Sequence, residues 1–200
     1  MSNQHFVTIE EAGVFLRAQL EADINASLTL HKHAVLILPG GNSIKLFFPY
    51  LLSIKAPWEK ITIALSDERC VPVYHEMSNE KQLKENFLNF LPAHNFCRLN
   101  EELTHKLKLY PAITVLSMGD DGHVASLFPE EYSKWKDKGI GIYKTKTKSP
   151  NRFTLTEKTI LLSSNIYILV VGHEKNCFFN ENYLTFLLNN IFEKSTCVIC

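Results

Sequence analysis

The sequence predicts a single α/β domain whose parallel sheet is flanked by helices. Short apolar runs of about four to six residues alternate with longer amphipathic stretches along residues 1–200, which is typical of parallel sheets with helical crossovers. Several of these runs are followed directly by glycines or charged residues. Because ligands of such sheets bind beyond the carboxyl ends of the strands, we expect a binding site at that edge.

The expected strands are compact runs rich in aliphatic or β-branched residues. In chain order they are His33–Leu38, Ile61–Leu65, Ala112–Leu116, Ile166–Val171 and Thr196–Ile199. The expected helices lie between them: Thr8–Leu30, Ser43–Ser53, Ser78–Leu91 and Lys175–Phe192. Thr8 and Glu11 have the spacing of a capping box, which marks the start of the first helix.

Composition argues against several classes of protein. The chain carries 21 Lys and Arg and 21 Asp and Glu residues, so its net charge is zero and nothing favours nucleic acid or an anionic membrane as a partner. The first residues lack the charged flank and apolar core of a signal peptide, and no apolar run approaches the roughly 20 residues of a spanning helix. The 5 cysteines are an odd number, which argues against a disulfide framework and for a reducing compartment. We therefore expect a cytoplasmic protein.

Three strand ends carry groups that suit an anion. Gly40-Gly41-Asn42-Ser43 precedes a helix, so its backbone N–H groups and two polar side chains can act as donors. Arg69 follows the second strand and Lys175 opens the last helix; both side chains pair well with phosphate. The glycine loop matches neither a Walker motif nor a GxGxxG fingerprint. Together the three strand ends predict a phosphorylated small molecule as the ligand.

The run Met118–Pro129 carries the candidate for acid–base chemistry. It follows the third strand, and two glycines bracket two carboxylates before His123. A histidine with a carboxylate nearby can act as a general base, so His123 is the expected base and Asp121 the group that orients its ring. The backbone N–H groups near Gly122 are the expected oxyanion donors. The sequence has no GxSxG nucleophile and no strong cluster of metal ligands, so we expect neither a metal nor a cofactor.

Four segments, in this order, resemble motifs of the 6-phosphogluconolactonase family. They are Ser66–Pro72 with the following His75 and Ser78–Asn79, then Met118–Pro129, Pro150–Thr156 and Val171–Lys175. The second segment reads Met-Gly-Asp-Asp-Gly-His-Val-Ala-Ser-Leu-Phe-Pro and is similar to the family signature over almost its whole length.

The resemblance implies a Rossmann-like, mostly parallel sheet related to that of glucosamine-6-phosphate isomerases, and no organic cofactor. It implies hydrolysis of 6-phospho-D-glucono-1,5-lactone to 6-phospho-D-gluconate in the oxidative pentose phosphate pathway, with His123 as the base for water. The glycine loop, Arg69 and Lys175 would hold the phosphate, and Asp67 would lie beside the sugar. The full set of expected binding residues is Gly40, Gly41, Asn42, Ser43, Asp67, Arg69, Gly122, Arg152 and Lys175.

Two alternatives stay open. The first is a glucosamine-6-phosphate isomerase or deaminase, but that related family places a Glu five residues after its histidine, where this chain has Phe128. The second is a non-enzymatic protein that binds a sugar phosphate, which would be expected to lose the base, whereas His123 is present. A monomer or a weak dimer is expected. Because the family's usual final segment is missing after Cys200, one fewer element and an exposed sheet edge are also expected.

Overall fold

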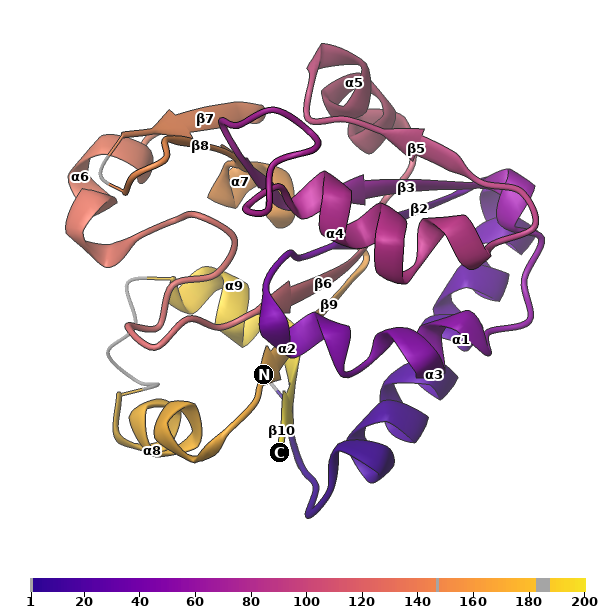
Figure 1. Cartoon of the computed structure of the whole chain (residues 1–200), viewed down its shortest axis with the longest axis horizontal. Helices are drawn as coiled ribbons and strands as arrows, with labels where there is room; N and C mark the ends of the chain where they lie inside the picture. The colour runs from indigo at the N-terminus through magenta and orange to yellow at the C-terminus, as the bar shows by residue number, and fades with distance from the viewer. Residues whose placement is uncertain (1, 147, 183–187) are drawn as a thin grey trace.

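A seven-stranded parallel sheet forms the centre of the molecule (Figure 1). The computed structural model describes residues 2–146, 148–182 and 188–200. The strand order is β1-β10-β9-β6-β2-β3-β5, and every neighbouring pair is parallel. The strands are β1 (Ser2–His5), β2 (Ala34–Leu38), β3 (Ile61–Leu65), β5 (Asn95–Cys97), β6 (Ile113–Ser117), β9 (Asn165–Val170) and β10 (Ser195–Ile199).

All five predicted strands are present, with ends shifted by no more than one residue. The prediction missed β1 because its residues are all polar, and it missed β5 because three residues are too short for a recognisable apolar run. β1 pairs with β10, and Ser2 lies opposite Thr196. The edge strand on this side of the sheet is therefore the mostly exposed β1 and not the last predicted strand.

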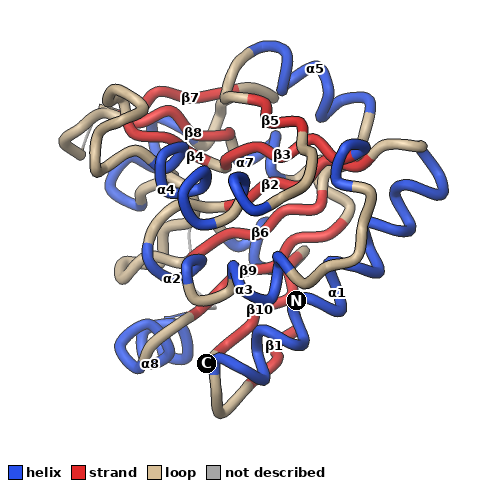
Figure 2. The backbone as a smooth tube through the Cα atoms, turned by 45° about the vertical axis from the view of Figure 1, so that its right-hand side comes forward, coloured by secondary structure: helices blue, strands red, loops and turns tan. Residues whose placement is uncertain are grey.

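Helices cover both faces of the sheet, as Figures 1 and 2 show from two directions. Side chains alternate along each buried strand, so Leu36 packs into one layer and Val35 and Ile37 pack into the other. The first layer contains α1 (Ile9–His31), α2 (Asn42–Lys45), α3 (Phe48–Leu52), η1 (Trp58–Lys60), α4 (Asn79–Asn86) and η2 (Leu88–Phe90). The second contains α5 (Glu101–Leu109), η3 (Pro129–Glu131), α6 (Tyr132–Trp135), α7 (Glu157–Ile160), α8 (His173–Asn182) and α9 (Asn189–Glu193).

Helices lie at all four predicted positions, but only the first, Thr8–Leu30, is a single helix throughout the described residues. The stretch Ser43–Ser53 is not one helix but the two short helices α2 and α3, because Pro49 stands in the first turn of α3 and has no N–H to continue a helical ladder. The predicted helix Ser78–Leu91 ends as α4 at Asn86 and continues as η2. Of the predicted helix Lys175–Phe192, residues 183–187 lie outside the described residues, and α8 and α9 flank them.

A small antiparallel sheet, which the sequence did not predict, lies beside the carboxyl end of β3. Its order is β4 (Asp67–Arg69), β8 (Arg152–Leu155) and β7 (Ile142–Thr145). In the β4–β8 pair, Asp67 lies opposite Thr154 and Arg69 lies opposite Arg152. This register brings a segment from late in the chain to the end of β3, and it places two arginines next to each other.

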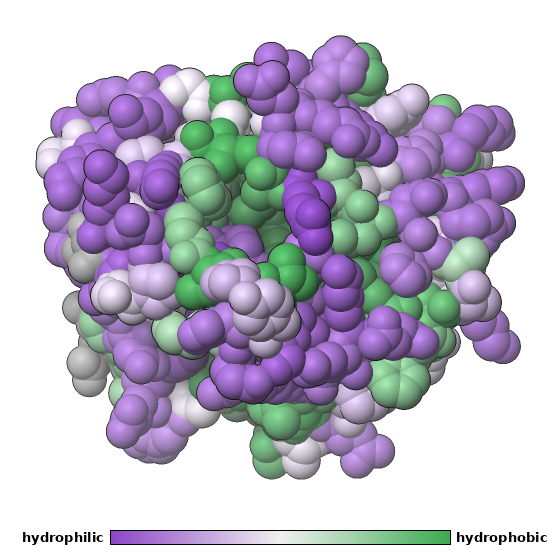
Figure 3. Space-filling view, turned by 45° about the horizontal axis from the view of Figure 1, so that its top comes forward, coloured by the Kyte–Doolittle hydropathy of each residue, from purple (hydrophilic) through white to green (hydrophobic). Residues whose placement is uncertain are grey.

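The surface is mainly hydrophilic. Figure 3 shows polar residues over most of one face and apolar residues gathered around a hollow. Within the described part of the chain, none of the helices is both long enough and apolar enough to cross a bilayer.

Replacing Gly13 with Ala should destabilise the protein, although Ala is the better helix former. A Cβ atom at Gly13 in α1 would lie 2.4 Å from Cδ2 of Tyr50 in α3. The helix-propensity gain is about 1 kcal/mol, whereas overpacking costs about 1–3 kcal/mol. We expect a net loss of roughly 1 kcal/mol in the free energy of unfolding, measured by urea titration. Gly139→Ala is the control, since a Cβ there has no neighbour within 4 Å. A Gly13→Ala protein more stable than the parent would contradict this packing.

Candidate active site

The pocket lies where the direction of the sheet connections reverses. β2 and β6 are neighbours in the middle of the sheet; the chain leaves β2 toward β3 on one side and leaves β6 toward β9 on the other. Such a point opens a crevice beyond the carboxyl ends of the two strands. A pocket of ≈ 530 Å³ occupies this place. Its lining residues are Pro39, Gly40, Gly41, Asn42, Ser43, Asp67, Arg69, Asn79, Ser117, Met118, Gly119, His123, Ala125, Arg152 and Lys175.

Most of the predicted site residues line this pocket. The four residues of the glycine loop lie there, together with Asp67, Arg69, His123, Arg152 and Lys175. Asp121 is not part of the wall but is bonded to His123. Gly122 is not brought to the pocket either. Its N–H donates to the carbonyl oxygen of Gly119 at 3.1 Å, so the structure does not support the expected oxyanion role for this group.

His123 is held in one orientation by three neighbours. Its Nδ1 atom is hydrogen-bonded to Oδ1 of Asp121, and its backbone N–H donates to the same oxygen at 3.2 Å. The imidazole packs against the ring of Phe128, with 4.6 Å between centroids. A Cβ atom at Gly119 would lie 2.1 Å from Cε1 of His123, so the ring needs a glycine there.

These contacts determine which nitrogen of His123 is available. The Asp121 carboxylate accepts a hydrogen bond, so Nδ1 carries the proton and Nε2 keeps its lone pair. No hydrogen bond to Nε2 is found among the described residues. Because His123 also lines the pocket, the ring can present a basic nitrogen to a bound molecule.

Asp121 is ionised at neutral pH, because its pKa is lowered on folding. Partial burial would raise the pKa of this carboxyl group, but the hydrogen bond and charge of His123 and the backbone N–H groups outweigh burial and lower the pKa to about 2. The carboxylate can therefore orient the imidazole and stabilise its protonated form.

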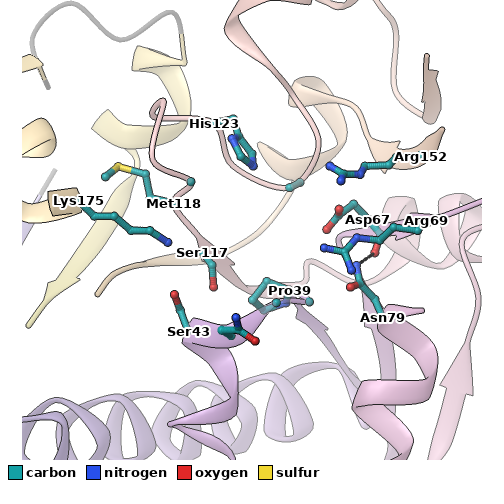
Figure 4. A pocket seen from close by; sticks show the side chains of 15 residues that line it. Pro39, Ser43, Asp67, Arg69, Asn79, Ser117, Met118, His123, Arg152 and Lys175 are labelled. Carbon is teal, nitrogen blue, oxygen red and sulfur yellow. Dashed lines mark hydrogen bonds between the residues drawn. The ribbon is translucent and has the colours of Figure 1, made fainter. Parts of the chain in front are cut away.

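Three cationic side chains face the same pocket. Figure 4 shows Lys175 on one side and Arg69 and Arg152 on the other, with His123 between them. Burial first, and then the charge of Arg69, lower the pKa of Arg152, while Asp67 opposes this change. Two guanidinium groups are thus held close enough to repel each other. An anion in the pocket would relieve that repulsion.

Two of the three cations are anchored to the protein by polar contacts. One guanidinium nitrogen of Arg69, Nη1, donates to the carbonyl oxygen of Met77 at 2.8 Å. Nζ of Lys175 lies 3.7 Å from Oδ1 of the exposed Asp120. These contacts orient the side chains and leave further donor groups on all three cations for a ligand.

The glycine loop is fixed by α4. The amide of Gln82 donates to the carbonyl oxygen of Gly41 at 2.8 Å and accepts from its N–H at 3.3 Å. Gly41 has a φ of 90°, which favours glycine. No side chain caps the start of α2, so the first N–H groups of its opening turn have no partner within the helix. Since the N–H of Gly41 is engaged, the groups left for an anion are those that follow it, together with the hydroxyl of Ser43.

Three groups around the pocket were not predicted as site residues from the sequence. Ser117 ends β6, and Asn79 begins α4; both line the wall. Ser126 is buried and donates from Oγ to Oδ2 of Asp67 at 2.6 Å, while Ser66 donates to the other oxygen at 3.1 Å. A polar residue at the end of an apolar strand was the available signal for Ser117. Ser126 lies in the Met118–Pro129 segment, but nothing local marked its hydrogen bond to Asp67, because that partner lies far away in the sequence.

The wall of the pocket holds polar atoms that lack partners. In the described part of the chain, five buried side-chain nitrogen or oxygen atoms have no hydrogen bond. Four of them belong to lining residues: Nε of Arg69, Oδ1 of Asn79, Oγ of Ser117 and Nε of Arg152. An unsatisfied buried group costs about 1–3 kcal/mol. Their gathering at one pocket indicates that a polar ligand completes their hydrogen bonds.

Comparison with known proteins agrees with the motifs. The family model for glucosamine-6-phosphate isomerases/6-phosphogluconolactonase matches residues 9–183. The chain belongs to this family. A 6-phosphogluconolactonase of Neisseria meningitidis is 30% identical over 169 residues, which is 74% of this chain and 73% of the relative.

Solved structures show the same fold. A protein from Neisseria gonorrhoeae has a TM-score of 0.84 at 24% identity, covering 98% of this chain and 97% of its own. A 6-phosphogluconolactonase from Thermotoga maritima has a TM-score of 0.82 at 22% identity, covering 98% and 97%. The family match includes every residue that lines the pocket. Among the described residues, no group of three or more His, Cys, Asp or Glu side chains could hold a metal ion.

Replacing Asp121 with Asn should make the free energy of unfolding less sensitive to pH in the acid range. A carboxyl group whose pKa falls on folding, here from 3.8 to about 2, stabilises the fold above its unfolded pKa, and this contribution is lost as the pH falls toward 2. The difference in unfolding free energy between the parent and Asp121→Asn should therefore shrink between pH 5 and pH 3. We expect a change below about 1 kcal/mol, because the carboxylate is partly exposed. Asp137→Asn, at an exposed position, serves as control. If the difference in unfolding free energy between the parent and Asp121→Asn were the same at pH 5 and pH 3, the lowered pKa of Asp121 would be contradicted.

Proposed function

We propose that this chain hydrolyses 6-phospho-D-glucono-1,5-lactone to 6-phospho-D-gluconate, a step of the oxidative pentose phosphate pathway. The observation that carries the proposal is the oriented imidazole of His123 in a pocket with three cations. Support also comes from the Neisseria meningitidis relative, which is named for this activity. A coupled assay that follows the product with a purified dehydrogenase, corrected for spontaneous hydrolysis, tests the activity directly.

His123 is the general base in this proposal. Nε2 removes a proton from water, and the oxygen attacks the lactone carbonyl carbon C1. The tetrahedral intermediate collapses with cleavage of the bond between C1 and the ring oxygen, and that oxygen takes the proton from Nε2. Asp121 stabilises the imidazolium that forms between the two steps. Of the groups in the wall, the guanidinium group of Arg152 is a donor that can stabilise the oxyanion.

In this proposal the phosphate group of the substrate makes most of the binding contacts. Lys175 on one side of the pocket and the arginines on the other surround the floor formed by the glycine loop. A phosphate dianion is strongly hydrated, so several charge-assisted hydrogen bonds must replace its water. The hydroxyl groups of Ser43 and Ser117 add neutral donors. Binding of the phosphate by these groups orients the lactone toward His123 and lowers the entropy cost of the reaction.

The structure gives no support to the isomerase alternative. Phe128 stands where the related enzymes were expected to have a Glu, and its buried ring packs against His123 and lies 5.3 Å from the guanidinium carbon of Arg152. A phenyl ring cannot transfer a proton. The non-enzymatic alternative is distinguished by the coupled assay, because a binding protein would give no product above the spontaneous rate.

We also propose a cytoplasmic location. All five cysteines are free thiols, and a reducing compartment keeps such thiols unpaired. A monomer or a weak dimer remains the prediction for the oligomeric state, to be measured by analytical ultracentrifugation.

Replacing His123 with Ala should lower kcat by about 10² to 10⁴. The loss follows from removing the proton acceptor, so KM should change much less. Steady-state kinetics in the coupled assay provide the measurement, and His105→Ala, at an exposed position of α5, is the matched control. Near-normal turnover by the His123→Ala protein would show that another group activates the water.

Replacing Arg69 or Lys175 with Ala should weaken kcat/KM for the phosphorylated lactone by about 10- to 100-fold, because each charged hydrogen bond contributes roughly 1.5–3 kcal/mol. The poor activity on unphosphorylated gluconolactone should hardly change. Lys45→Ala, an exposed lysine of α2 outside the pocket wall, is the control. Equal losses on both substrates would mean that the cation acts on the lactone ring or on the fold.

A further inference from the structure

We infer that Asn79 recognises a ring hydroxyl of the substrate by accepting its hydrogen bond, which makes Asn79 a specificity-determining residue. The inference rests on the proposed function and extends it to the non-reacting part of the sugar. It starts from Oδ1 of Asn79, a buried acceptor that lines the pocket and has no donor among the described residues.

The orientation of the Asn79 amide is determined by its partners. Its Nδ2 group donates to the backbone carbonyl oxygen of Asp67 at 2.9 Å. A carbonyl oxygen only accepts, so turning the amide over would place two acceptors together. The backbone N–H of Asn79 donates to Oε1 of Glu68 at 2.8 Å, which fixes the start of α4. Oδ1 is therefore the end of the amide that is left for a ligand.

The surroundings of Oδ1 leave little room for rearrangement. The Asn79 residue is 1% exposed. A Cβ atom at Gly40 would lie 2.0 Å from Oδ1, so the glycine loop packs directly against the amide. Figure 4 shows Asn79 on the same side of the pocket as Asp67 and Arg69. A donor that enters the pocket beside Gly40 would complete the hydrogen bonding of this acceptor.

The chemistry of the substrate decides which group supplies that donor. A phosphate dianion and a lactone carbonyl only accept hydrogen bonds, so neither can satisfy Oδ1. The secondary hydroxyls of the sugar are its donors. Asp67 lies beside Asn79 with both carboxylate oxygens positioned by serine hydroxyls. The two acceptors form the part of the pocket that suits sugar hydroxyls, and Arg69 beside them supplies donors for the phosphate.

The test is a cycle between enzyme variants and substrate analogues. The phosphorylated lactone is compared with its 2-, 3- and 4-deoxyfluoro analogues, since fluorine is close to a hydroxyl in size but cannot donate. The parent enzyme should lose about 5- to 20-fold in kcat/KM on one analogue, as expected for a neutral hydrogen bond. Asn79→Ala should show a similar loss on the normal lactone and no further loss on that analogue.

Three results would overturn the inference. The first is a parent enzyme that loses less than about twofold on every analogue relative to the normal lactone, and this measurement needs no variant that folds. The second is an Asn79→Ala protein that loses the same factor on all four substrates, since this is the behaviour of a purely structural residue. The third is a parent enzyme that hydrolyses none of them above the spontaneous rate, in which case the proposed function fails first. Asn86→Ala, at an exposed position of the same helix, should match the parent throughout.

Discussion

The parallel pairing of β2, β3, β6 and β9 is the constraint on which the rest of the site depends. Because these strands run in one direction, the loops that follow them all leave from the same edge of the sheet. Short loops are then enough to bring together a glycine loop, a base and two kinds of cation. The apolar layers on both faces keep the strands in register, so core packing determines the separation of groups that never touch each other.

Much of this arrangement could be predicted from the sequence because it is encoded locally. The strands could be predicted from the apolar runs. His123 and most residues of the pocket wall could be predicted because they lie in the loops that follow those runs. The antiparallel pair of β4 and β8 could not be predicted in this way. Both segments are only three or four residues long, and their pairing of Arg69 with Arg152 is a contact between distant parts of the chain. Local sequence carries no signal for such a register; only the family resemblance pointed to Arg152.

The single polar residues of the site show the same limit. Ser117 and Asn79 stand at the end of a strand and at the start of a helix, where polar residues commonly complete backbone hydrogen bonds. Their role in the pocket appears only when the fold shows that Oγ of Ser117 and Oδ1 of Asn79 have no partner among the described residues. Gly122 shows the reverse case. Its N–H was predicted to be free for an oxyanion, but it donates to the carbonyl oxygen of Gly119 within the same turn. Burial and hydrogen bonding, rather than residue type, separate these cases.

The unpartnered atoms of the wall also restrict the kind of ligand that fits. Nε of Arg69 and Nε of Arg152 are donors, and Oγ of Ser117 can donate as well, so an anion with several oxygens could satisfy all three. Oδ1 of Asn79 has the opposite requirement, because it needs a donor. Inorganic phosphate in its dianionic form supplies few donors, and a neutral sugar supplies no charge for the cations. A phosphorylated polyhydroxy compound has both kinds of group on one molecule, so the hydrogen bonds that this pocket lacks favour a sugar phosphate over either part alone.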